Sequence, residues 1–120
     1  MIDFISRPMS KSTVVVEVSG SLDETDRSYF FDCVGDIIDS GYENVVIECH
    51  RLGHIRSSGL AALLGARKRA AKRGSRIYLT HLNSRLARVL ERTKLGRLLL
   101  VYPETEDAIA CVERELVPAS

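Results

Sequence analysis

The sequence has little that would cross-link the chain or anchor it in a membrane. Its three cysteines, Cys33, Cys49 and Cys111, are odd in number and lie among apolar residues. We therefore expect reduced thiols rather than a disulfide framework or a metal site. No apolar run approaches the roughly 20 residues that span a bilayer, and Asp3 and Arg7 interrupt the segment where a signal peptide would be apolar. These features predict a cytoplasmic protein without membrane insertion.

An excess of one charge is also lacking. Lys and Arg number 17 and Asp and Glu 16, so the net charge of +1 argues against a general binder of nucleic acid or membranes. Basic residues do gather, mostly late in one predicted helix, where the helix dipole favours them, and no aromatic residue is interleaved among them for base stacking. They are Arg67, Lys68, Arg69, Lys72, Arg73 and Arg76. The helix dipole is the simplest explanation of these residues. Alternatively, they bind an acidic surface on another protein.

Motifs of catalysis and nucleotide binding are missing as well. The chain has no Gly-x-Ser-x-Gly nucleophile elbow, no Gly-x-Gly-x-x-Gly fingerprint and no P-loop. His50 and His54 are four residues apart, but they lie in a predicted loop without the adjacent acid of a zinc protease. We predict no catalytic residue, no metal and no cofactor, and we do not expect an enzyme.

Alternating strands and helices are what the sequence does contain. Residues rich in β-branching predict strands at Thr13–Val18, Asn44–Cys49, Ser75–Thr80 and Leu98–Val101, with a weak edge strand at Met1–Ile5. Apolar spacing predicts helices from 22–26 to 40–41, from Leu60 to Arg73, from 83–84 to 93–96 and from 104–105 to 116. This order predicts an α/β fold with a mixed, mostly parallel sheet of four to five strands and about four helices. We expect one domain over residues 1–120, with its core at about 12–117.

Particular residues support this assignment. The apolar run from Val45 to Ile47 predicts a central strand covered on both faces, and residues 50–54 are predicted to form a loop. Gly41 is the expected left-handed residue after one helix, and Gly74 is expected to end another. The predicted core includes Val14, Val16, Val18, Val46 and Ile47.

The junction Ile55-Arg56-Ser57-Ser58-Gly59-Leu60 stands where a predicted strand meets a predicted helix. Ser57 or Ser58 can cap that helix by accepting a backbone N–H that has no partner inside it. The positive end of the helix dipole lies at the same place, so a phosphate on either serine would meet a favourable field. The alternative is that Ser57 or Ser58 only caps the helix and has no role in signalling.

These residues resemble the STAS domain of bacterial anti-sigma factor antagonists. The likeness rests on Val45 to Leu64 with its Ser-Ser-Gly-Leu, on Gly20-Ser21-Leu22-Asp23, and on Asn83 to Gly96. It covers nearly the whole chain. By this resemblance Ser58 would be the phosphorylated residue, with Ser57 as the alternative. The residues that bind the partner would be Asp23, Arg56, Ser57, Ser58, Gly59 and Leu60.

The resemblance implies a regulatory protein-binding module. Its partners would be an anti-sigma factor that is also a serine kinase, and a phosphatase that resets the switch; self-association is left open. One departure is Arg56, which stands where the family has an acid before the two serines. The alternative is a STAS scaffold that is not phosphorylated, in a stress-signalling or lipid-transport complex. A small hydrolase is a distant third.

Overall fold

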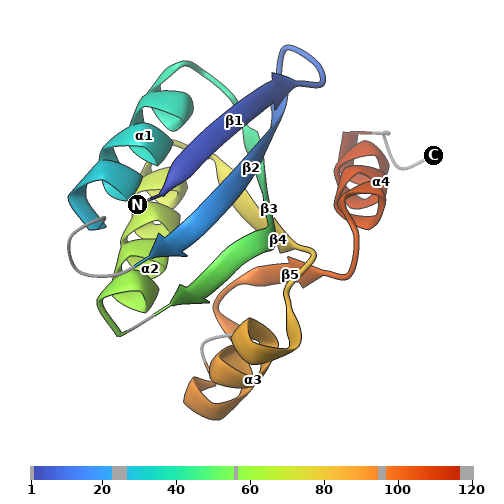
Figure 1. Ribbon diagram of the computed structural model, residues 1–120. Helices are drawn as coiled ribbons and strands as arrows, with labels where there is room; N and C mark the ends of the chain where they lie inside the picture. The colour runs from blue at the N-terminus through green and yellow to red at the C-terminus, as the bar shows by residue number, and fades with distance from the viewer. Residues whose placement is uncertain (1, 23–26, 56, 95–96, 117–120) are drawn as a thin grey trace.

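The computed structural model describes residues 2–22, 27–55, 57–94 and 97–116. Along the chain its elements are β1 (Asp3–Pro8), β2 (Thr13–Leu22), α1 (Arg27–Asp39), β3 (Asn44–Ile55), α2 (Ser57–Lys72), β4 (Arg76–Thr80), α3 (Ser84–Thr93), β5 (Leu100–Tyr102) and α4 (Thr105–Leu116). The sheet keeps the order β1-β2-β3-β4-β5; β1 is antiparallel to β2 and the other pairs are parallel. The predicted mixed, mostly parallel α/β fold is confirmed (Figure 1).

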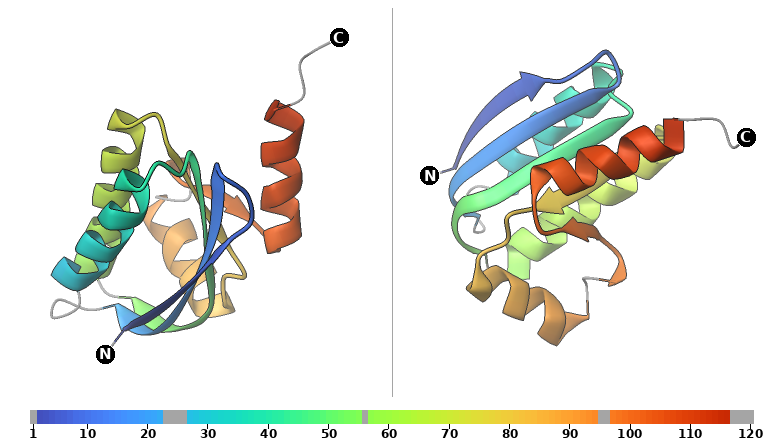
Figure 2. Two further views of the ribbon diagram at one scale, coloured as in Figure 1. Left: turned by 90° about the horizontal axis from the view of Figure 1, so that it is seen from above. Right: turned by 90° about the vertical axis from the view of Figure 1, so that its right-hand side faces the viewer.

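The sheet lies between two helical layers. Helices α1 and α2 cover one face and α4 covers part of the other (Figures 1 and 2). Because side chains alternate along a strand, Val45 and Ile47 of β3 face the α1–α2 layer, while Val46 packs with Val15 and Ala108 on the α4 side. The prediction of a central strand that is covered on both faces is confirmed.

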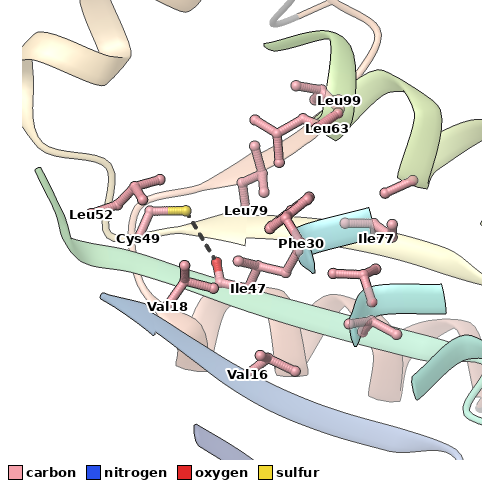
Figure 3. Close-up of a cluster of buried hydrophobic side chains, with 14 of the residues drawn as sticks. Val16, Val18, Phe30, Ile47, Cys49, Leu52, Leu63, Ile77, Leu79 and Leu99 are labelled. Atoms are coloured by element: carbon pink, nitrogen blue, oxygen red, sulfur yellow. Dashed lines mark hydrogen bonds between the residues drawn. The ribbon is translucent and has the colours of Figure 1, made fainter. Parts of the chain in front are cut away.

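The larger core cluster joins the sheet to α1 and α2, as Figure 3 shows. Phe30 of α1 and Leu63 of α2 pack on Ile47 and Leu79, and all four side chains are buried. Each such side chain contributes about 1.5–3 kcal/mol on leaving water. The five core residues that the sequence predicts, Val14, Val16, Val18, Val46 and Ile47, are all buried.

The predicted loop at residues 50–54 is wrong, because β3 continues to Ile55. β2 likewise continues past Val18 to Leu22, and the two extensions pair in parallel, with Gly20 opposite Leu52. Pairing with β2 therefore provides the backbone hydrogen bonds of this segment, which we had predicted to be a loop. β4 ends at Thr80, which is paired with Glu48 of β3. The paired extensions of β2 and β3 therefore project beyond the end of β4.

Other boundaries shift by a few residues. β1 covers Asp3–Pro8 rather than residues 1–5, and β5 covers Leu100–Tyr102 rather than 98–101. α2 begins at Ser57, three residues before the predicted Leu60. Gly41 is left-handed as predicted, with φ of 102°, and Gly74 has φ of 72°. Such ends depend on pairing and capping partners, which a local pattern does not contain.

Candidate functional site at the carboxyl edge of the sheet

The carboxyl ends of β2 and β3 lie side by side, next to the start of α2 (Figure 1). Leu22, the last residue of β2, is paired with Ile55, the last residue of β3. The chain therefore leaves the sheet from two neighbouring points, and α2 begins immediately after the second of them. In parallel α/β sheets this edge is where binding sites gather.

Both candidate serines belong to the first turn of α2, which runs from Ser57 to Lys72. The first four N–H groups of a helix have no partner within it, and the dipole makes this end positive. Gly59 and Leu60 are buried, and Leu60 packs in the larger core cluster. Asp23 and Arg56, the other two predicted partner-binding residues, lie outside the described residues.

Asn83, in the segment between β4 and α3, connects α3 to the same edge of the sheet. Asn83 caps α3: its side-chain oxygen accepts the N–H of Leu86 at 2.8 Å. The amide nitrogen of the same side chain donates to the carbonyl of Leu52 in β3 at 2.7 Å. One residue thus fixes the start of α3 against the extension of β3 that leads to Ser57.

A buried polar cluster on the α4 face was missed at the sequence level. Glu48 of β3 is 6% exposed, and Arg7 of β1 donates to its Oε1 at 2.8 Å. The Thr105 hydroxyl, at the start of α4, donates to Glu48 Oε2 and lies 3.1 Å from the Thr80 hydroxyl. The backbone N–H of Thr105 donates to His81 Nε2 at 3.3 Å. These groups satisfy one another, so the cluster acts as a clamp that holds the first turn of α4 on the sheet.

The one signal of this cluster in the sequence is an acid within an apolar strand, at Glu48. Its partners come from β1, β4 and α4, and Thr105 is 57 residues away along the chain. No local pattern contains that information.

Two arginines of the basic cluster are paired within the protein. Arg69 and Arg73 contact the carboxylate of Asp39, at the end of α1, at 2.8 and 3.3 Å. The Arg69 guanidinium also lies 5.4 Å from the centre of the Phe31 ring, a cation–π arrangement. These two arginines therefore connect α2 to α1.

All three cysteines are free thiols, as predicted. Cys49 is buried, and burial raises the pKa of its thiol to about 12. Within the described ranges, no group of three or more His, Cys, Asp or Glu side chains is placed to hold a metal ion. The helices of those ranges include none long and apolar enough to cross a membrane.

The sequence model of the STAS domain matches residues 5–108. This chain belongs to the STAS domain family. The match contains β2, β3, the start of α2 and the Asn83 cap, so the whole carboxyl edge described above lies within the STAS domain. No curated protein sequence matches the chain significantly.

Solved structures agree on the STAS fold. A Thermotoga maritima protein described as an anti-sigma factor antagonist has a TM-score of 0.84 at 22% identity, over 92% of this chain and 94% of that one. The anti-sigma factor antagonist SpoIIAA in its unphosphorylated form gives 0.77 at 22% identity, over 97% and 100%. A sulfate transporter family protein from Wolinella succinogenes gives 0.76 at 20% identity, over 89% of each chain. The STAS fold is therefore found both among anti-sigma factor antagonists and in the sulfate transporter family.

Proposed function

We propose that this STAS domain is a cytoplasmic regulatory protein-binding module, not an enzyme, and that phosphorylation of Ser58 switches it. The observation that carries the proposal is the position of Ser58, in the first turn of α2 directly after β3. SpoIIAA, whose fold this chain resembles, has been solved in phosphorylated and unphosphorylated forms. The proposed partners are a serine kinase of the anti-sigma factor class and a phosphatase that removes the phosphate.

The physics of the switch is electrostatic. A phosphoserine carries about −1.5 to −2 charges at neutral pH. At a helix N-terminus the N–H groups and the dipole accommodate that charge in the free protein. In a contact surface the same charge costs desolvation and repels acidic groups of the partner. The unphosphorylated form therefore binds, and the phosphorylated form is released.

We propose that Asp23 and Arg56 belong to the same binding surface. Each follows directly on one of the paired residues Leu22 and Ile55, which supports their being neighbours at the carboxyl edge. Arg56 offers the planar fork of donors that binds phosphate, so it would neutralise part of the new charge and weaken the release.

The test is the affinity for a kinase-type anti-sigma factor from the same genome, measured by titration calorimetry. We expect Ser58→Asp to weaken binding at least about tenfold, the loss expected when an unpaired charge enters an interface. Ser58→Ala and the matched control Ser57→Ala should bind like the wild type. Equal affinity of Ser58→Asp and wild type would contradict the proposal.

The second candidate is a STAS scaffold that is not switched by phosphate. It is favoured by the likeness to the sulfate transporter family protein and by Arg56, which replaces the acid of the antagonist motif. A neighbouring gene for a kinase-type anti-sigma factor would favour the switch, and neighbouring transporter genes the scaffold.

A further inference from the structure

A cavity of about 320 Å³ lies beside the short edge strand β5, between the second half of α2 and α4. It exists because β5 has only three residues and pairs with Tyr78–Thr80 alone. The start of β4, at Arg76 and Ile77, therefore has no β5 residue opposite it. The cavity is at the amino end of β4, whereas the candidate serines follow the carboxyl end of β3.

The walls combine apolar surface with positive charge. Ala71, Ile77 and Leu99 are apolar lining residues, and the described residues that line the cavity include no Asp or Glu. At the rim, Leu98 and Leu100 keep 47% and 41% of their surface exposed, so the two leucines add an exposed apolar patch beside the arginines. This apolar surface is available to a ligand.

Three arginines, Arg67, Arg76 and Arg97, are among the residues that line the same cavity. Within the described part of the chain, Arg67 and Arg97 form no ion pair, although both are exposed. Other arginines do find carboxylates: Arg7 and Arg51 contact Glu17, and Arg69 and Arg73 contact Asp39. Arg67 and Arg97 lie beside apolar walls and have no carboxylate partner among the described residues, so they are suited to the bidentate binding of a carboxylate or phosphate.

We propose that this cavity binds a small amphipathic anion. The apolar body of the ligand lies against Ala71 and the exposed Leu98 and Leu100, and its carboxylate or phosphate accepts hydrogen bonds from Arg67 and Arg97. The volume is at the lower end of the range for small-molecule sites, which restricts the ligand to a short chain or a single ring. The cavity is separate from Ser58, so its proposed ligand binding does not depend on the proposed phosphorylation.

The test is titration calorimetry of the whole chain with octanoate, octyl phosphate, octanol and inorganic phosphate. Saturable binding of octanoate or octyl phosphate, with octanol and inorganic phosphate each at least about tenfold weaker, is the expected result, because neither half of the ligand suffices alone. Comparing the two anions distinguishes a fatty carboxylate from a phosphate ester. Failure of both to bind, or binding of octanol as tight as that of the anions, would overturn the proposal.

Three variants locate the site. Arg97→Gln removes one guanidinium and should weaken the better anion about tenfold. Ala71→Phe fills the cavity from an exposed position on α2, so it should abolish binding while circular dichroism stays unchanged. Lys68→Gln, on the same helix but outside the lining, is the matched control and should bind like the wild type. Unchanged binding by both Arg97→Gln and Ala71→Phe would place the ligand elsewhere and refute this site.

Discussion

Replacing Asn83 with alanine tests how the carboxyl edge of this STAS domain is held together. Its side chain accepts the N–H of Leu86 and donates to the carbonyl of Leu52. Loss of a helix cap costs about 0.5–2 kcal/mol, and a buried carbonyl without a partner costs about 1–3 kcal/mol. Because Asn83 is only half-buried, water relieves part of this loss, and we expect a total near 2 kcal/mol in the free energy of unfolding.

Urea unfolding at equilibrium measures this difference, and a serine at the same position divides it into two parts. Serine caps a helix about as well as asparagine, but it carries no amide to donate to Leu52. Asn83→Ser should therefore lose about 1 kcal/mol, between wild type and Asn83→Ala. A cost below about 0.5 kcal/mol for alanine, the range of ordinary surface substitutions, would refute the double role of Asn83.

Three further predictions concern the stability of the fold. Ile47→Ala should cost about 2–5 kcal/mol in urea unfolding, whereas Val101→Ala, at a side chain that is 39% exposed, should stay within about 0.5 kcal/mol; equal costs would contradict the central position of β3. Gly74→Ala should cost about 1–2 kcal/mol and lower the melting temperature, because φ is 72° there while the space around it is open; an unchanged melting temperature would contradict that backbone geometry. Because burial raises the pKa of Cys49 to about 12, the unfolded thiol loses its proton first as pH rises above about 9, and stability should fall by up to about 1.4 kcal/mol per pH unit. Cys49→Ala should remove this fall, and parallel pH profiles for wild type and variant would count against it.

The central part of the fold could be predicted from the sequence because its signals are local. Val45 to Ile47 form a continuous apolar run, and such runs are typical of parallel strands that are covered on both faces. Gly41 and Gly74 follow their helices at the positions where a positive φ is needed. The position of Ser57 and Ser58 after a strand and at the start of a helix could be predicted for the same reason.

What could not be predicted depends on contacts between distant segments. The extension of β3 through Arg51 and Leu52 is a strand because β2 runs beside it, not because its residues favour extended structure. The clamp around Glu48 joins residues from four elements. The cavity exists because β5 is short, and the length of β5 follows from its pairing with β4, not from a local pattern.

The phosphate acceptor is the central claim, and peptide mass mapping tests it most directly. Wild type, Ser58→Ala and Arg56→Asp are each incubated with the cognate kinase and ATP. We predict phosphate on the Ser58 peptide of the wild type, none on Ser58→Ala, and faster phosphorylation of Arg56→Asp, in which the acid of the antagonist motif is restored. Phosphate that persists on Ser58→Ala would transfer the role to Ser57 or another residue. Absence of phosphate from both wild type and Arg56→Asp would contradict the switch and leave the scaffold function in its place.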